Sequence, residues 1–144
     1  MSSIKKLERI SFAVGDPDKA RDFFSNVLGA EFEESVDVED FKFRYQPFML
    51  GGTRMQLLSS TDPDSVISRF LMKRQQGFHH LTYEVDDLDE AIDEFRSKGV
   101  EVVSRHEYRQ VLEGFHVREA FVHPQNAFGI LIQLLEKKKA RAEL

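Results

Sequence analysis

The sequence predicts one α+β domain built from two similar halves, each with a strand, a helix and three further strands. Two segments of the first half recur in the second half in the same order. Apolar and polar residues alternate along the first strand of each half, as they do in half-buried strands. Because recurring segments are typical of a duplicated unit, we expect a pseudo-twofold, cupped mixed sheet with the helices on its outer face.

The two recurring segments pair residues of similar chemistry. The first segment places Arg9 over His80, and the second places Gln56 over Gln133. Two matches in the same order argue for a duplication more strongly than one match does. The matched ranges are 9–20 with 80–91, and 55–58 with 132–135.

The first helix has a start signal, an apolar stripe and a stop signal. Asp16 suits the N-cap position, and Pro17 suits the first helical position. Gly29 suits the position after the last turn, where a left-handed backbone ends a helix. Apolar residues between these signals recur at helical spacing. They are Ala20, Phe23, Phe24, Val27 and Leu28.

The second half repeats these helix signals. Asp87 and Glu90 form a capping-box pattern, and Gly99 ends the helix. A shorter helix is predicted to begin at residues 62–65, between the halves. The apolar stripe of the second helix is Leu88, Ala91, Ile92 and Phe95, and the buried side of the shorter helix is Val66, Ile67, Phe70 and Leu71.

These elements divide the chain into a first module, a linker helix, a second module and a charged tail. Their ranges are 7–58, 62–75, 78–135 and 136–144. The expected strands cover 7–14, 31–36, 41–49 and 53–58 in the first module and, after the opening strand of the second module, 100–104, 115–122 and 129–135.

Composition excludes several classes of function. A net charge of −5 argues against a nucleic-acid binder, which usually carries a basic surface. The chain has no Cys, which excludes disulfides and thiolate metal sites. No apolar run approaches the roughly 18 residues of a membrane span, and the first residues lack the apolar run of a signal peptide. We therefore expect a cytoplasmic protein that does not bind membranes.

Polar residues gather on the sheet face that the helices are expected to leave open. The helices must cover the face that carries Ile10, Phe12 and Val14. Polar groups that converge on a concave surface are typical of a ligand pocket, although each one could instead be an ordinary solvated strand residue. The polar set is Arg9, Ser11, Gln56, His80, Thr82, Glu84 and Gln133.

The order of elements and several motifs resemble the vicinal oxygen chelate superfamily of glyoxalases, bleomycin-resistance proteins and dioxygenases. The nearest likeness is to its methylmalonyl-CoA epimerase-like and glyoxalase-like members. The resemblance covers about residues 7–136 and implies a homodimer. Its motifs lie at residues 50–58, 77–88, 121–124 and 129–134.

The resemblance implies a divalent metal site with one ligand on the first and last strand of each module. Epimerases of this type use His, Gln or Glu, His and Glu, and these positions carry Arg9, Gln56, His80 and Gln133 here. Arginine cannot ligate a cation. The remaining candidate ligands, His80, Gln56 and Gln133, make a poor site for zinc or cobalt, so no cofactor is certain.

We hypothesise that the Arg9 guanidinium replaces the metal and grips a carboxylate or an enolate-like oxygen. His80 then serves as a general acid or base, while Ser11, Thr82 and the two glutamines bind substrate. The resemblance implies an isomerase or lyase that acts beside a carbonyl, carboxylate or thioester of an acyl-CoA or a 2-oxo acid. The alternative is a binding or resistance-type protein that holds a small molecule without turnover.

Several of these side chains could instead have ordinary structural roles. Arg9 could form a salt bridge with Glu8 or Glu84, and His80 could be a hydrogen-bonded wall residue. The alternation places His79 on the face covered by the helices, and the phase of His116 is open. The remaining polar segments are a turn at His123 and a charged loop with Arg105, His106, Arg109 and Glu113.

Overall fold

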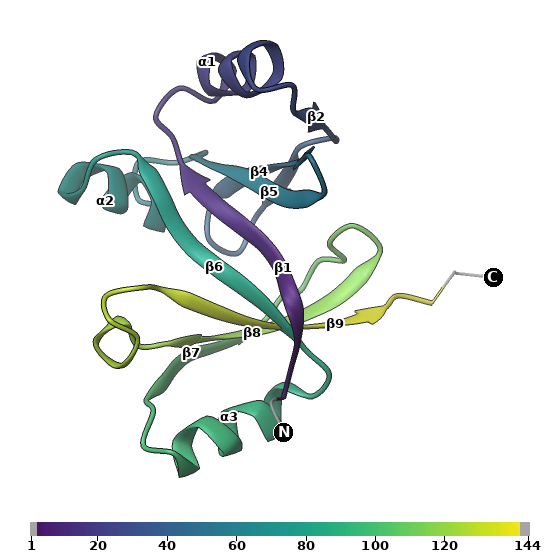
Figure 1. Cartoon of the computed structure of the whole chain (residues 1–144), viewed down its shortest axis with the longest axis vertical. Coiled ribbons are helices and arrows are strands. Elements are labelled where there is room, and N and C mark those ends of the chain that lie inside the picture. Colours follow the sequence, from purple (N-terminus) through teal and green to yellow (C-terminus); the bar gives the residue numbers. More distant parts are fainter. Residues whose placement is uncertain (1–2, 142–144) are drawn as a thin grey trace. The chain divides into compact units, whose positions relative to one another are not determined.

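The computed structural model describes residues 3–141, which form two compact units (Figure 1). The first unit is Arg9–His79. The second unit combines the described residues up to Glu8 with those from His80 onward. The strands β1 (Ile4–Ala13) and β6 (Gly77–Val85) each contribute one part to either unit. The border thus falls inside these strands, whereas the sequence predicted modules that begin at residues 7 and 78.

The first unit has a mixed sheet in which β1 pairs parallel with β5, while the other strand pairs are antiparallel. The strand order is β2-β4-β5-β1, and β3 also pairs with β4. The predicted strand over residues 31–36 is wrong in detail, because this segment forms two short strands. The strands after β1 are β2 (Glu31–Phe32), β3 (Val36–Val38), β4 (Phe43–Leu50) and β5 (Thr53–Ser60).

The first helix of this unit, α1 (Pro17–Asp22), begins as predicted. Asp16 Oδ1 accepts a hydrogen bond from the Lys19 amide at 3.1 Å. From its stripe, Ala20 and Phe24 pack against a core that includes Phe48 and Leu57. This packing covers the sheet face of Leu57, so the face of its strand neighbours Gln56 and Leu58 lies opposite α1.

The rest of the predicted stripe is not buried. Phe23, Val27 and Leu28 are 50%, 67% and 45% exposed. The reason is a π-helical turn, η1 (Phe23–Val27), in which the Leu28 amide donates to the Phe23 carbonyl. A π turn adds a residue to the turn and shifts the helical phase, so these three side chains rotate away from the core.

The linker helix α2 (Val66–Lys73) begins at Ser65, whose hydroxyl accepts a hydrogen bond from the Ser68 amide at 3.0 Å. Ile67 is its buried residue. Val66 is 42% exposed, so its predicted place on the buried side is wrong. As the first helical residue after the cap, Val66 lies where the chain enters the helix.

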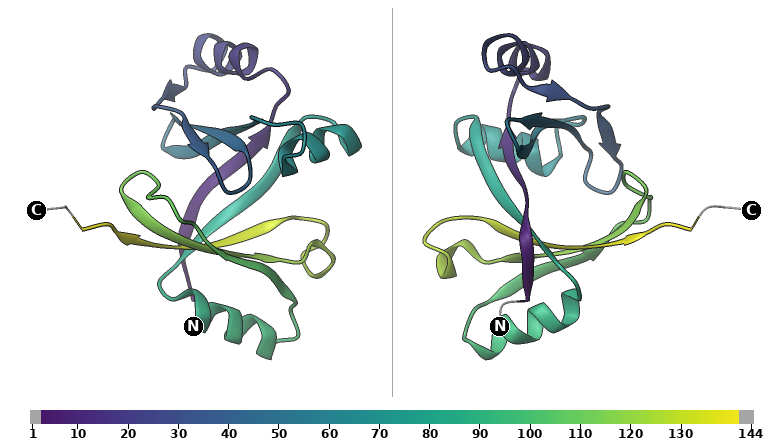
Figure 2. Two further views of the ribbon diagram at one scale, coloured as in Figure 1. Left: turned by 180° about the vertical axis from the view of Figure 1, so that it is seen from behind. Right: turned by 45° about the vertical axis from the view of Figure 1, so that its right-hand side comes forward.

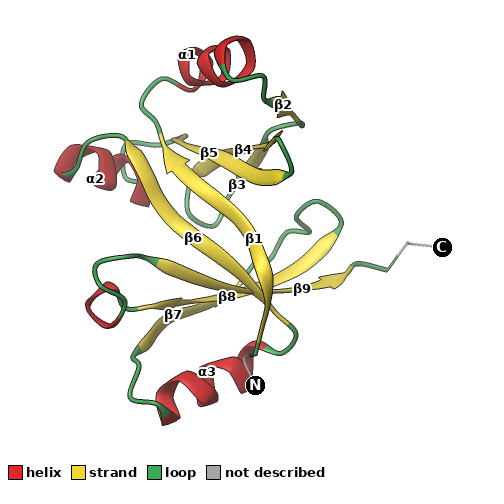
Figure 3. Ribbon diagram, viewed as in Figure 1, coloured by secondary structure: helices red, strands yellow, loops and turns green. Residues whose placement is uncertain are grey.

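The second unit has a mixed sheet in strand order β6-β9-β8-β7 (Figure 3). The pair β6 and β9 is parallel, and the other two pairs are antiparallel. The α+β class and the mixed character of the sheet, predicted from the sequence, are therefore confirmed. The strands that follow β6 are β7 (Val102–Glu107), β8 (Phe115–Val122) and β9 (Ile132–Lys139).

The strand β9 continues into the predicted charged tail. Glu136 is buried, and its carboxylate accepts hydrogen bonds from the Leu88 amide at 2.8 Å and from Arg118 at 2.5 Å. The strand thus extends four residues, 136–139, into the segment predicted to be a charged tail. The carboxylate of Glu136 is paired inside the unit, and the sequence alone cannot show this pairing. Residues 142–144 of the predicted tail lie outside the described residues.

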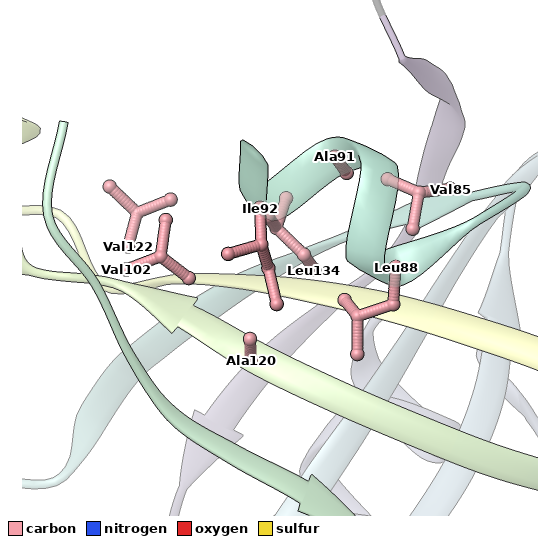
Figure 4. Packing of buried hydrophobic residues seen from close by; sticks show 8 residues of the cluster. All are labelled: Val85, Leu88, Ala91, Ile92, Val102, Ala120, Val122 and Leu134. Carbon is pink, nitrogen blue, oxygen red and sulfur yellow. The ribbon is translucent and has the colours of Figure 1, made fainter. Parts of the chain in front are cut away.

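The helix α3 (Leu88–Ser97) covers one face of this sheet, and Figure 2 shows it beside β7 and β8 from two further sides. Asp87 Oδ1 caps it by accepting from the Glu90 amide at 3.0 Å, and Gly99 ends it with a φ of 79°. Figure 4 shows the core beneath α3. This core consists of Val85, Leu88, Ala91, Ile92, Val102, Ala120, Val122 and Leu134.

A 3₁₀ turn, η2 (Pro124–Asn126), connects β8 to β9. His123 occupies its N-cap, as the predicted turn requires, and its Nδ1 accepts from the Gln125 amide at 3.2 Å. Among residues 3–141, no helix is long and apolar enough to cross a membrane.

Candidate functional site

A buried polar group lies on the first unit's sheet, on the face opposite α1. Ser11 and Gln56 are register partners on the parallel strands β1 and β5. Gln56 Oε1 accepts a hydrogen bond from Arg9 Nη1 at 2.6 Å, and Gln56 Nε2 donates to Ser11 Oγ at 2.9 Å. All three side chains are at least nine-tenths buried. The structure therefore joins three of the predicted site residues in one hydrogen-bonded chain.

The Arg9 guanidinium also lies over an aromatic ring. Its central carbon is 5.5 Å from the centroid of Tyr45, a buried residue on β4. A guanidinium over a ring face is attracted by the ring quadrupole, so Tyr45 and Gln56 both hold Arg9. Tyr45 was not among the site residues predicted from the sequence. Its alternation with Arg44 and Gln46 predicted only a half-buried strand.

The second unit carries the corresponding polar group on the face opposite α3. Thr82 and Gln133 are register partners on the parallel strands β6 and β9. Gln133 Oε1 accepts a hydrogen bond from Thr82 Oγ1 at 2.6 Å and lies 3.1 Å from His80 Nε2. The side chains of His80, Thr82 and Gln133 are buried. The duplication seen in the sequence thus extends to these contacts.

Two further residues of this group were missed by sequence reasoning. Glu119 Oε1 accepts hydrogen bonds from Gln133 Nε2 at 2.7 Å and from the Tyr108 hydroxyl at 2.6 Å. Glu119 is only 3% exposed. The signal was an acidic residue between apolar Val117 and Phe121 on one face of the predicted strand 115–122. The group therefore carries a carboxylate, although Gln133 itself is an amide.

The two groups differ in how the glutamine amide is oriented. In the first unit the amide nitrogen faces the hydroxyl of Ser11, whereas in the second unit the amide oxygen faces the hydroxyl of Thr82. The charged neighbour explains the difference. A guanidinium only donates hydrogen bonds and a carboxylate only accepts them, so Gln56 turns its oxygen to Arg9 and Gln133 turns its nitrogen to Glu119.

The neighbouring histidines are not part of these groups. The ring of His79 packs against Phe70, with centroids 4.6 Å apart, as the predicted alternation requires. Burial, with a smaller contribution from nearby Arg74, lowers the pKa of His79 to about 4. His116 is exposed and lies an odd number of residues from Glu119 along β8, so the two side chains point to opposite faces.

The remaining predicted polar residues have structural partners. Glu84 lies 3.9 Å from Lys5 and 4.0 Å from Lys6. In the charged segment, Arg105 pairs with Asp89 at 3.0 Å. Hydrogen bonding from Arg118 is the main reason that the pKa of Asp89 lies below its usual range. Arg105 therefore serves an ion pair of the second unit, and a role in ligand binding stays a prediction for the rest of that segment.

The candidate ligand atoms do not suit a divalent metal. Within residues 3–141, no three His, Asp or Glu side chains cluster as they would around an ion. The oxygen of Gln56 accepts from a guanidinium, and the oxygen of Gln133 accepts from Thr82. Zinc and cobalt favour imidazole and carboxylate ligands, so the donor set predicted from the sequence does not fit such an ion.

Comparison with known proteins identifies the family. The model of the Glyoxalase/Bleomycin resistance protein/Dioxygenase superfamily matches residues 6–134. The chain belongs to this superfamily. The resemblance inferred from the sequence is thereby confirmed.

The relatives in this superfamily include epimerases. The mitochondrial methylmalonyl-CoA epimerase of Bos taurus is 34% identical over 134 residues, which cover 92% of this chain and 74% of that protein. The crystal structure of methylmalonyl-CoA epimerase from Mycobacterium tuberculosis has a TM-score of 0.83 at 31% identity, covering 96% of this chain and 91% of that one. A methylmalonyl-CoA epimerase in complex with methylmalonyl-CoA and NH4+ has a TM-score of 0.81 at 25% identity, covering 97% and 99%.

Proposed function

We propose that this protein is an epimerase of acyl-CoA thioesters, which removes and returns a proton at the carbon beside the thioester carbonyl. The observation that carries the proposal is the buried Arg9 guanidinium, held by Gln56 at the position where the resemblance implies the first metal ligand. The similarity to methylmalonyl-CoA epimerases supports this class of substrate.

Epimerisation beside a thioester has two chemical requirements. A base must take the α-proton, and a positive or hydrogen-bonding group must stabilise the enolate oxygen that forms. Removing the proton leaves the electron pair of the C–H bond on the substrate as the enolate. Returning a proton to the opposite side of the carbon inverts its configuration.

Arg9 meets the second requirement in this proposal. Its guanidinium presents several N–H donors in a fixed plane, and it keeps its charge when buried. Tyr45 and Gln56 fix its orientation in advance, which lowers the cost of organising the site during the reaction. An epimerase relative is known in complex with methylmalonyl-CoA and NH4+, another nitrogen cation with one positive charge.

His80 meets the first requirement. Its imidazole is buried and is held at Nε2 by the Gln133 oxygen. Histidine ordinarily titrates near neutral pH, which suits a group that takes the α-proton on one side of the carbon. In this proposal a water molecule returns a proton on the opposite side. In this proposal Ser11 and Thr82 orient the two glutamines from the strands beside them, and they do not react with substrate.

Hydrogen exchange tests the proposal. The purified protein is incubated with methylmalonyl-CoA in heavy water, and deuterium at the α-carbon is measured by mass spectrometry. We expect exchange in the wild type, loss of exchange in His80→Gln, and wild-type exchange in the matched control His116→Gln, which changes an exposed histidine. Absence of exchange in the wild type would contradict the proposed epimerase activity.

A binding protein without turnover is the second candidate. It is favoured by Gln133, which places an amide where epimerases of this type carry a carboxylate. Calorimetry with methylmalonyl-CoA and with a 2-oxo acid distinguishes the candidates. Tight binding of either ligand by a wild type that shows no exchange supports the binding role. A lyase would instead convert the substrate to a product of different mass. Cytoplasmic location and a homodimer stay predictions.

A further inference from the structure

The Gln133 amide lies between a carboxylate on one side and a hydroxyl and an imidazole on the other. Its nitrogen donates to Glu119 Oε1 at 2.7 Å, and its oxygen accepts from Thr82 at 2.6 Å. The same oxygen lies 3.1 Å from His80 Nε2. Because all these side chains are buried, a reversed amide would leave polar atoms facing partners of the wrong kind.

The carboxylate decides which way the amide points. A carboxylate only accepts hydrogen bonds, whereas a hydroxyl can donate or accept. Reversal of the amide would place the Gln133 oxygen against the Glu119 carboxylate, so that two acceptors would repel each other. The Tyr108 hydroxyl donates to the same carboxylate oxygen at 2.6 Å and keeps it in place.

In the first unit a charged residue also orients the glutamine amide, but its charge is positive. There the Arg9 guanidinium, which only donates, is met by the oxygen of Gln56. The amide nitrogen of Gln56 is left to face Ser11, whose hydroxyl accepts. In both units the charged residue determines the orientation of the glutamine amide. The hydroxyl then accepts from the amide nitrogen in the first unit and donates to the amide oxygen in the second.

We propose that Glu119, held by Tyr108, is a positioning residue that sets the tautomer of His80 through the Gln133 amide. Because Gln133 presents its oxygen, the Nε2 atom of His80 must carry a hydrogen and donate it. In the neutral ring the lone pair then lies on Nδ1. A hydrogen-bond partner held in one orientation commonly fixes which ring nitrogen of a histidine is protonated.

This tautomer makes Nδ1 the atom of His80 that accepts the proton of the substrate, a consequence that rests on the proposed function. The α C–H bond of the thioester breaks, its electron pair stays on the substrate as the enolate, and the proton moves to Nδ1. Protonated His80 still donates from Nε2 to Gln133. Glu119 does not touch the substrate in this scheme.

The tautomer can be measured without substrate. Two-bond ¹H–¹⁵N correlation spectra of the ¹⁵N-labelled protein distinguish the two neutral forms of histidine, and the signals of His80 are those missing from His80→Gln. We expect the Nε2–H form in the wild type. A wild-type ring in the Nδ1–H form would overturn the proposal without any variant of Glu119.

Glu119→Gln removes the constraint on the orientation of the Gln133 amide, because the amide introduced at position 119 can either donate a hydrogen bond to Gln133 or accept one from it. We expect the ratio of the Nε2–H form to the Nδ1–H form to fall roughly tenfold, the order expected when a hydrogen bond to a charged group is lost. Tyr108→Phe keeps the carboxylate but removes the hydroxyl that holds it, so we expect a smaller fall in this ratio than in Glu119→Gln.

A double variant tests the mechanism by rescue. Glu119→Gln combined with Gln133→Glu moves the carboxylate to position 133, where His80 and Thr82 can still donate to it. We expect this variant to recover the Nε2–H form. An unchanged ratio in Glu119→Gln, or no recovery in the double variant, overturns the proposal.

These outcomes separate the tautomer proposal from the proposed function. If the ratio does not respond while the wild type exchanges the α-proton, the positioning role fails and the epimerase stands. If the ratio responds but the wild type shows no exchange, the positioning role stands and the epimerase fails.

Discussion

Arg9 and Gln56 meet across the adjacent strands β1 and β5, with Arg9 Nη1 2.6 Å from Gln56 Oε1. The contact is buried, and Tyr45 lies against the guanidinium. A hydrogen bond to a charged donor is stronger than one between neutral groups, so the contact defines both the place and the plane of the positive charge.

Substitution of Arg9 is expected to reduce catalysis more than binding. Arg9→Gln removes the charge, and loss of one preorganised donor to an oxyanion typically lowers kcat about 100- to 1,000-fold. Arg9→Lys keeps the charge but not the planar fork, and we expect an intermediate rate. The measurement is the kcat and KM of α-proton exchange. A wild-type kcat in Arg9→Gln would remove Arg9 from the mechanism.

Removal of divalent ions is expected to leave exchange unchanged. The oxygens of Gln56 and Gln133 already accept hydrogen bonds from Arg9 and Thr82, and within residues 3–141 no group of three His, Asp or Glu side chains offers other ligands. The protein is dialysed against a chelator, its metal content is determined by elemental analysis, and exchange is measured before and after. A tight stoichiometric site for zinc or cobalt in calorimetry contradicts this expectation.

Truncation of Leu88 is expected to destabilise the second unit. Its side chain projects from the first turn of α3 and is fully buried in the core between α3 and the sheet (Figure 4). Leu88→Ala should lower the free energy of unfolding by about 2–5 kcal/mol, because the deletion removes apolar contacts and leaves a cavity. The matched control is Val27→Ala at an exposed position, where the expected change is below about 0.5 kcal/mol. Urea unfolding followed by circular dichroism measures both.

His79 is expected to make the protein less stable as the pH falls from about 6.5 towards 4. Burial, then the charge of Arg74, lowers its folded-state pKa to about 4 from the ordinary value of 6.5. Between these values the unfolded chain binds the proton more readily, so protonation favours unfolding. Between pH 7 and pH 5 we expect roughly 1–2 kcal/mol from this group.

The comparison with His79→Gln isolates this contribution. Unfolding in urea at pH 7 and pH 5 gives the pH dependence of each protein. The variant should lose less stability than the wild type over this interval, because glutamine does not titrate. Equal losses in the two proteins contradict a lowered pKa at His79.

Features that depend on local chemistry were predictable from the sequence. The caps at Asp16 and Asp87 and the glycine at position 99 act over a few neighbouring residues. The placement of Ser11 and Gln56, and of Thr82 and Gln133, on the sheet face that the helix leaves open was also predictable from the alternation along the strands.

Features that depend on register or on distant charges were not predictable. Glu119 joins Gln133 only because β8 and β9 pair in a register that places Phe121 beside Gln133. Glu136 falls in the predicted charged tail, because its pairing with Arg118 on another strand cannot be read from the sequence. That the four repeat-related side chains serve one ligand stays a prediction.

The Gln56 and Gln133 amides have opposite orientations, so the two halves of the chain are no longer interchangeable. A chain assembled from two copies of the first half would carry two guanidinium groups and no buried carboxylate beside a glutamine. Two copies of the second half would carry two carboxylates and no such guanidinium. The two halves repeat the same strand arrangement, but Arg9 places a positive charge beside the glutamine of the first half and Glu119 places a negative charge beside that of the second half. Neither half can therefore replace the other.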